Sequence, residues 1–245
     1  MSSGERALIF DVDGTLVDSN DAHAAAWAEA LREFDIDRDV DAILPLIGMG
    51  SDKMLPRMAG VSIDSDLGKR ISARRAELFR DVYLDHIQPF PSTRELFLRL
   101  RVDDVRLAIA SSAQEDELDA LLEIARVRDL VEPRLTTSKS RVASSKPDPD
   151  SVQAALDQLD TEPGLTLMVG DSPYDIEAAT RAGLGTIALR CGGWADRDLW
   201  ESIAIYQDPK ALLAGYEARE WTWPAAPSRG DTKTGAAPPA NSSMR

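Results

Sequence analysis

The feature that most constrains this chain is a short apolar run near its start that ends on two acidic residues. Ala7–Phe10 carries four consecutive apolar side chains, which predicts a strand buried on both faces of a sheet. Asp11 and Asp13 follow it, and the turn former Gly14 then ends the strand. Ligands of an open α/β sheet lie at the carboxyl ends of its strands. Two carboxylates there repel each other, which favours a hard cation such as Mg²⁺ between them, although an acidic turn after a core strand is the simpler alternative.

Farther along the chain, predicted strands alternate with predicted helices. The apolar or β-branched runs that predict strands lie at residues 105–110, 134–137, 165–169 and 186–189. The helical patterns lie at residues 93–101, 115–125, 148–159 and 173–182. This alternation predicts an α/β fold, with a doubly wound, Rossmann-like parallel sheet and helices on both of its faces.

One segment departs from this alternation, because no strand is predicted between residue 18 and about residue 89. Apolar residues at helical spacing predict helices over residues 20–34 and 66–85, the second with the row Leu67, Ile71, Arg75, Leu78 and Val82. We therefore expect an all-helical insert over residues 19–88 and a catalytic core over residues 1–18 and 89–223. Residues 224–245 are rich in Pro, Ala, Ser and Gly, which predicts a disordered tail.

The composition restricts the classes of partner. With 245 residues, the chain is long enough for one α/β domain with a sizeable insertion. Its net charge of −14 disfavours binding to nucleic acid or to an anionic membrane surface. A single cysteine, Cys191, fits a reducing compartment, and no apolar run approaches the ~18 residues of a membrane span. We therefore expect a cytoplasmic protein, either a monomer or a homodimer, whose partner is a small molecule.

Polar groups follow several of the predicted strands, so the sheet would bring them to one crevice. Ser111 and Ser112 follow residues 105–110, and Asp171 follows residues 165–169. Lys146 lies in a loop just before a predicted helix. Phosphoryl transfer would give each group a role.

The proposed roles follow from the chemistry of each side chain. Asp11 could attack phosphorus and form an aspartyl-phosphate, while Asp13 could protonate the leaving oxygen and then activate water. Asp171 would complete a Mg²⁺ site with Asp11. Ser111 and Lys146 would hold the phosphoryl oxygens.

Four of these segments also resemble, in order and spacing, the motifs of the haloacid dehalogenase superfamily. They are residues 11–15, Ser111, residues 146–147 and residues 170–175, and the resemblance covers about residues 6–213. It implies that Asp11 is the nucleophile and a metal ligand, and that Asp13 is the acid/base with its backbone carbonyl on the metal. It also implies phosphate binding by Ser111, with its neighbour Ser112, and by Lys146, and metal binding by Asp171. Asp175 matches a second acid, which orients the lysine or a metal-bound water in relatives.

The helical insert resembles the type-one cap of the phosphoglycolate phosphatase and β-phosphoglucomutase branch. His23 either couples the cap to Asp13 or is a packing histidine beside Trp27. Arg75 either points across the cleft toward a substrate anion or extends from the helix edge toward solvent, and the second alternative is favoured. An acid at Asp13 argues against haloacid dehalogenation, because the dehalogenases lack one there.

These observations predict a Mg²⁺-dependent phosphomonoester hydrolase that acts on a small organic phosphate through an aspartyl-phosphate on Asp11. The first alternative is a phosphosugar mutase of the β-phosphoglucomutase type, with the same nucleophile. An alternative of another class is a non-catalytic phosphate-binding or regulatory protein. The identity of the phosphorylated metabolite stays open, because specificity resides in the cap and the loops that it meets.

Overall fold

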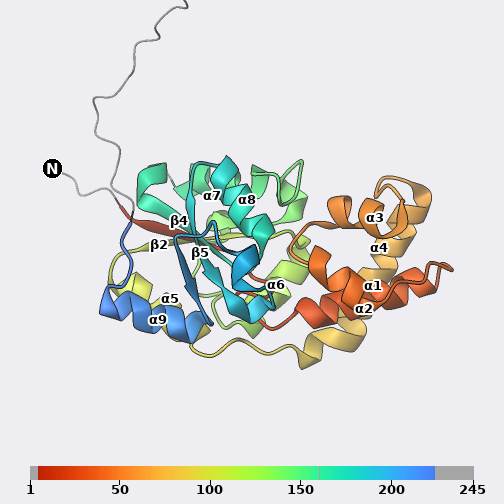
Figure 1. The fold of residues 1–245 in the computed structure, drawn as a ribbon, viewed down its shortest axis with the longest axis horizontal. Helices are drawn as coiled ribbons and strands as arrows, with labels where there is room; N and C mark the ends of the chain where they lie inside the picture. The colour runs from red at the N-terminus through yellow and green to blue at the C-terminus, as the bar shows by residue number, and fades with distance from the viewer. Residues whose placement is uncertain (1–4, 160, 224–245) are drawn as a thin grey trace, which may run out of the picture.

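The centre of the protein is a six-stranded sheet, seen here in a computed structural model that describes residues 5–159 and 161–223 (Figure 1). The strand order is β3-β2-β1-β4-β5-β6, and every neighbouring pair is parallel. The strands are β1 (Ala7–Phe10), β2 (Arg106–Ala110), β3 (Thr136–Thr137), β4 (Thr166–Gly170), β5 (Gly185–Leu189) and β6 (Ala204–Tyr206). The order reverses between β1 and β4, which confirms the predicted doubly wound α/β fold.

Helices cover both faces of the sheet. α5 (Thr93–Val102) and α9 (Pro209–Ala218) pack on each other on one side, and α7 (Asp150–Leu159) and α8 (Pro173–Arg181) lie on the other (Figure 1). α6 (Glu115–Ile124) follows β2. Short 3-10 turns occupy Pro133–Leu135, Lys139–Arg141, Pro163–Leu165, Arg190–Gly192 and Asp196–Asp198.

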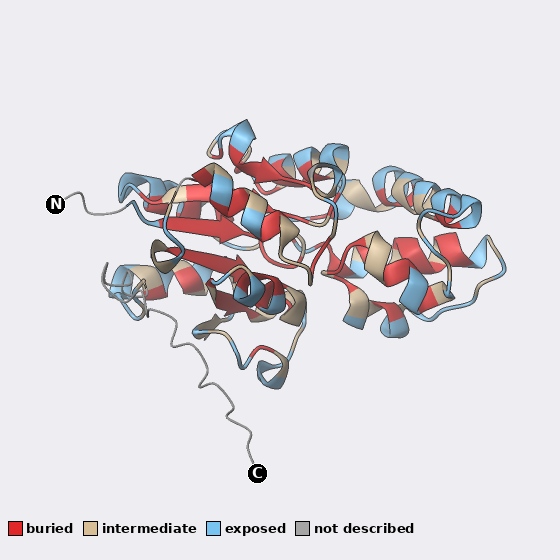
Figure 2. Ribbon diagram, turned by 90° about the horizontal axis from the view of Figure 1, so that it is seen from above, coloured by how far each residue is buried: buried red, intermediate tan, exposed pale blue. Residues whose placement is uncertain are grey.

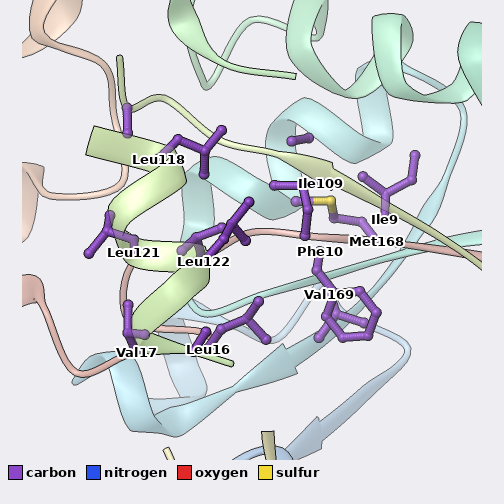
Figure 3. Packing of buried hydrophobic residues seen from close by; sticks show 14 of the residues in the cluster. Ile9, Phe10, Leu16, Val17, Ile109, Leu118, Leu121, Leu122, Met168 and Val169 are labelled. Carbon is purple, nitrogen blue, oxygen red and sulfur yellow. The ribbon is translucent and has the colours of Figure 1, made fainter. Parts of the chain in front are cut away.

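The core lies between these helices and the central strands. All four residues of β1 are fully buried, and the ring of Phe10 lies 4.6 Å from that of Phe97 on α5. Leu118, Leu121 and Leu122 of α6 pack into the same cluster, beside Leu16 (Figure 3). Figure 2 shows the buried strands inside and the exposed faces of the helices outside. Strands buried on both faces are typically near-continuous apolar runs, as β1 is.

The segment between β1 and α5 forms a helical layer beyond the carboxyl ends of the strands (Figure 1). It comprises α1 (Asn20–Arg32), α2 (Val40–Ile43), α3 (Ser51–Ala59) and α4 (Asp66–Leu78), a π-helical turn over Phe79–Tyr83, and 3-10 turns over Leu44–Leu46 and Leu84–His86. No strand occurs between α1 and α5, where every residue is described. The limits of 19–88 as a domain stay a prediction, and residues 224–245 lie outside the described part of the chain.

The structure corrects the predicted row of the second long helix. Leu67 and Val82 are 38% and 48% exposed, whereas Phe79, which the row omitted, is buried. For Val82 the reason is the π-helical turn at Phe79–Tyr83, which has more residues per turn than an α-helix and therefore rotates the following side chains away from the expected face.

At the start of α5, the side chain of Ser92 makes no cap hydrogen bond, and Thr93 donates its hydroxyl to the carbonyls of Leu16 and Phe90. Two further expectations need correction. Thr186–Leu189 is not the last strand, because β6 follows it; β6 is a short apolar run of only three residues, all of them half-buried. The helix predicted from residue 148 begins at Asp150.

No helix among the described residues combines the length and the apolar character needed to cross a membrane.

Candidate active site

Three buried carboxylates gather at the carboxyl ends of β1 and β4. Asp11 follows β1, and its N–H donates to the carbonyl of Val169 on β4, so the sheet ladder extends to the site. One carboxylate oxygen from each of Asp11, Asp171 and Asp175 lies within 4.8 Å of the others. Gly14 bends the chain past them at a φ of +70°, and a Cβ there would collide with Asp171. The turn after β1 therefore requires glycine for both its backbone and its space.

Lys146 provides positive charge inside this cluster. Its Nζ lies 2.5 Å from Oδ1 of Asp11 and 2.7 Å from Oδ1 of Asp175, and the side chain is almost wholly buried. The other oxygen of Asp175 accepts from the N–H and the hydroxyl of Ser172, in the capping box of α8. The helix start thus holds Asp175 against Lys146, which is one of the two roles that the resemblance implies for Asp175.

The carboxylates of the cluster outnumber its cations. Burial raises the pKa of Asp11 to about 7, and the charge of Lys146 only partly opposes this rise. Burial, with the charges of Asp175 and Asp11, also raises the pKa of Asp171 well above its ordinary value. Shifts of this direction arise when desolvated carboxylates lack enough positive charge.

The donor set therefore fits a divalent cation. Buried carboxylate oxygens are the ligands that Mg²⁺ prefers, and a cation between Asp11 and Asp171 would remove their mutual repulsion. Thr15 donates to Oδ1 of Asp171 at 3.0 Å, and Asn20 donates to Oδ2 at 3.1 Å. These two bonds fix the orientation of Asp171.

Asp13 faces a different environment from Asp11. Its Oδ1 accepts from the hydroxyl of Ser19 at 2.6 Å and lies 2.7 Å from Nε2 of His23, whose ring stacks on Phe79 at 4.0 Å. Burial alone would raise the pKa of Asp13, but the charge and hydrogen bond of His23, together with Ser19, bring it below its ordinary value. Two neighbouring aspartates thus have pKa values shifted in opposite directions.

The two serines after β2 lie differently. Phe10 pairs with Ile109, so Asp11 and Ser111 emerge from neighbouring strands at the same edge of the sheet. Ser111 is buried, and its Oγ accepts from the N–H of Ala113. Ser112 lines the cavity beside Asp11, with its Oγ 3.5 Å from the carbonyl of Gly48.

Arg75 turns inward, contrary to the favoured expectation that it extends toward solvent. Its side chain is 12% exposed, and its Nη1 lies 2.7 Å from Oε2 of Glu117, on α6 of the core. The guanidinium carbon lies 5.2 Å from the centre of the Trp27 ring. The rings of Trp27 and Phe79 favour a cation over their faces, which keeps Arg75 in the site.

A small cavity of about 50 Å³ opens between the helical layer and the strand ends. Asp11 and Asp13 line one part of it, and Arg75 and Glu117 line another. The remaining lining residues are His23, Trp27, Ile47, Gly48, Met49, Ser51, Met54, Ser112 and Ala113. The cavity therefore joins the carboxylates to side chains of the helical insert.

Further contacts hold the insert over the core. Asp52 accepts a hydrogen bond from Ser145, and Lys53 pairs with Asp148 at 2.6 Å. The hydroxyl of Tyr174 donates to the carbonyl of Pro45 at 2.6 Å. These contacts join α3 to the loop that carries Lys146, and the 3-10 turn before α3 to the first turn of α8, which carries Asp175.

Sequence reasoning missed three residues of the site: Ser19, Asn20 and Glu117. Ser19 and Asn20 follow the recognised motif, and both residue types are common at helix starts. The sequence therefore does not distinguish a residue that caps the helix from one that contacts Asp13 or Asp171. Glu117 lies in an acidic first turn, which helix-dipole energetics explain as well. Cys191 packs against the turn after β1: its Sγ lies 3.2 Å from the carbonyl of Gly14, and burial raises its pKa.

Comparison with known proteins agrees with this geometry. Residues 8–189 match the model of a family described as haloacid dehalogenase-like hydrolases. A phosphoglycolate phosphatase of Rhodospirillum rubrum is 31% identical over 76% of this chain and 80% of its own length. The fructose-1-phosphate phosphatase YqaB of Escherichia coli is 25% identical over 75% of this chain and 95% of its own. The crystal structure of a hydrolase from Pseudomonas syringae superposes with a TM-score of 0.81 at 28% identity, covering 87% of this chain and 99% of that one.

Proposed function

The chain belongs to the haloacid dehalogenase-like hydrolase family, and from that membership we propose that it hydrolyses phosphomonoesters of a small metabolite through an aspartyl-phosphate on Asp11. The observation that carries the proposal is the pairing of two aspartates with opposite environments. Asp11 lies among carboxylates and against Lys146, whereas Asp13 lies against His23 and Ser19. One carboxylate is thus placed to attack and the other to move a proton.

In the first step, a carboxylate oxygen of Asp11 attacks phosphorus. The bond from phosphorus to the ester oxygen breaks, and that oxygen takes a proton from Asp13 as the alcohol leaves. Lys146 and Ser111 are the groups of this chain that would hold the phosphoryl oxygens as negative charge redistributes. Ser112, at the edge of the same cavity, would contact the phosphoryl group from the core.

In the second step, water attacks the phosphorus of the aspartyl-phosphate. Asp13 takes a proton from that water, inorganic phosphate leaves, and Asp11 returns to its carboxylate form. His23 lies 2.7 Å from Asp13 and is close enough to exchange that proton with it. The lowered pKa of Asp13 keeps its carboxylate ionised in the metal-free protein, so that it is able to accept a proton.

Asp11 and Asp171 would hold Mg²⁺, together with the backbone carbonyl of Asp13. Bound there, the ion supplies positive charge that neutralises the carboxylates and the phosphoryl oxygens. Thr15 and Asn20 orient Asp171, and Asp175 holds Lys146. These four side chains, Thr15, Asn20, Asp175 and Lys146, would thus keep the carboxylates of Asp11 and Asp171 in place for the ion.

The helical insert would act as a cap. It contributes Trp27, Met49, Met54 and Arg75 to the cavity, so the leaving group of the substrate would lie against it. Closure of such a layer excludes bulk water from the reacting phosphorus.

A screen of metabolite phosphates for release of inorganic phosphate, with and without Mg²⁺, tests the proposal. We expect turnover of at least one small phosphomonoester that requires Mg²⁺ and is lost with EDTA. If no ester releases phosphate and calorimetry shows that one of them binds tightly, the result would support a non-catalytic binding protein instead.

The mutase alternative uses the same nucleophile and differs in the acceptor of the phosphoryl group. A coupled assay for isomerised hexose phosphate, run beside the phosphate-release assay, separates the two reactions. We expect free phosphate to be the main product, and an isomerised sugar phosphate in excess of free phosphate would identify the mutase.

A further inference from the structure

The part of the cavity away from the candidate nucleophile contains an ion pair between the cap and the core. Arg75 belongs to α4 and Glu117 to α6, and the two side chains are only 12% and 11% exposed. Nη1 of Arg75 lies 2.7 Å from Oε2 of Glu117. Both residues line the cavity that Asp11 and Asp13 also line, so a bound substrate would meet this pair.

The ion pair of Arg75 and Glu117 disfavours a leaving group that carries a negative charge. Glu117 already compensates the positive charge of Arg75, and the other carboxylates that line the cavity are those of Asp11 and Asp13. A substrate carboxylate in this space would have to separate Arg75 from Glu117. It would then remain close to the Glu117 carboxylate, because Glu117 and Arg75 line the same cavity and lie 2.7 Å apart. Like charges at such short range, away from solvent, are strongly unfavourable.

A hydroxyl group meets the same pair without this conflict. It donates to the carboxylate of Glu117 and accepts from the guanidinium of Arg75. The Nε of Arg75 is buried and has no hydrogen-bond partner in the described part of the chain, so a donor is available there. Trp27, Met49 and Met54 supply apolar surface for the carbon atoms of the leaving group.

We propose that Glu117 determines the substrate class: the leaving group is a short, neutral, hydroxyl-bearing carbon chain, as in a polyol or small sugar phosphate, and carboxylate-bearing esters are disfavoured. The proposal rests on the phosphomonoesterase activity proposed above and specifies the substrate of that same site. Arg75 and Glu117 act together, with Arg75 as donor and Glu117 as acceptor.

Two esters that differ only in their terminal group provide the test. 2-Hydroxyethyl phosphate ends in a hydroxymethyl group, and 2-phosphoglycolate ends in a carboxylate. With the wild-type protein and Mg²⁺, we expect kcat/KM to be about tenfold or more higher for 2-hydroxyethyl phosphate. In Glu117→Gln we expect this ratio to fall by about tenfold or more, mainly through a lower KM for 2-phosphoglycolate.

Asp116→Asn is the matched control, because it removes an exposed carboxylate from the same helical turn. We expect it to leave the ratio within twofold of the wild-type value. The wild-type ratio itself needs no variant, so the test holds even if Glu117→Gln does not fold.

The failures of the two proposals are distinguishable. Turnover of a generic aryl phosphate, combined with an equal or higher kcat/KM for 2-phosphoglycolate, would overturn the assignment of Glu117 alone. An unchanged ratio in folded Glu117→Gln would overturn it as well. Absence of Mg²⁺-dependent turnover of every ester, the aryl phosphate included, would overturn the proposed function and with it this inference.

Discussion

At the scale of single residues, the site depends on how each carboxylate is surrounded. Asp11, Asp13 and Asp171 could be foreseen as a group, because Asp11 and Asp171 directly follow buried strands, Asp13 lies two residues after Asp11, and strand ends converge. Their environments could not be foreseen. The partner of Asp13 is set by the path of α1, and the partner of Arg75 lies 42 residues away on another element.

The raised pKa of Asp11 predicts that Mg²⁺ binding depends on pH. Asp11 must be deprotonated to bind the ion, and its pKa without metal is about 7. Protons therefore compete with Mg²⁺ below pH 7, and the affinity falls by about tenfold per pH unit for each proton displaced. Calorimetric titration with Mg²⁺ from pH 5.5 to 9 measures this. We expect a steep loss of affinity below about pH 7; a flat profile across pH 7 would contradict the raised pKa.

His23 predicts an effect on the titration of Asp13. His23→Ala removes the charge and the hydrogen bond that lower the pKa of Asp13, so burial then dominates and that pKa rises. Carboxyl ¹³C chemical shifts, titrated in the metal-free protein, measure the change. We expect the Asp13 midpoint to move to higher pH and kcat to fall about tenfold to a hundredfold. An unchanged midpoint would assign His23 a packing role alone, beside Phe79.

At the scale of elements, the start of α1 joins the insert to the carboxylates. Ser19 and His23 contact Asp13, and Asn20 contacts Asp171. The first turn of this helix thus reaches both the candidate acid/base and a candidate metal ligand. A movement of α1 relative to the sheet would change the surroundings of both groups.

The hydrogen bond from Asn20 to Asp171 therefore predicts that a substitution in α1 changes the affinity for Mg²⁺. Asn20→Ala removes the donor to Oδ2 of Asp171, and loss of such a supporting bond weakens metal binding about tenfold to a hundredfold. Calorimetry with Mg²⁺ alone, without substrate, is the measurement. Asp21→Asn alters the exposed neighbour on the same turn and serves as the control. An affinity of Asn20→Ala within threefold of the wild-type value would show that Thr15 alone suffices to orient Asp171.

The elements also show where a pattern in the sequence stops being informative. β1, β2 and β4 are buried apolar runs and were predicted to within about a residue. β6 has three half-buried residues, and its place at the sheet edge depends on pairing with β5. The π-helical turn at Phe79 could not be predicted from the sequence, because it changes the register of the helix without changing its composition.

At the scale of the whole molecule, an acidic protein confines its key cation to the interior. The net charge is −14, yet Lys146 is buried between Asp11 and Asp175. A phosphorylated substrate would therefore meet the Lys146 ammonium only once it is inside the site. The fold class and the helical nature of the insert followed from the sequence, whereas the cytoplasmic location and the oligomeric state stay predictions.

The packing of the core beside Asp11 predicts how much one buried side chain contributes to the free energy of unfolding. Phe97 is fully buried on α5, and its ring packs at a tilt against that of Phe10, which immediately precedes Asp11. Phe97→Ala should lower the free energy of unfolding by about 3–5 kcal/mol, because it leaves a cavity beside β1. Leu98→Ala, at a residue 43% exposed on the same helix, should cost about 0.5 kcal/mol or less. Urea unfolding of both variants measures this, and similar losses for the two would contradict the burial of Phe97.

The central claim is that Asp11 is the nucleophile of a phosphomonoesterase, and the most direct measurement is phosphate release by Asp11→Asn beside the wild-type protein. Both are assayed with Mg²⁺ on the best ester of the screen, after melting curves establish that the variant is folded. The amide cannot form the aspartyl-phosphate, so we expect kcat to fall about a thousandfold or more. A folded Asp11→Asn variant whose Mg²⁺-dependent kcat lies within about tenfold of the wild-type value would contradict the account.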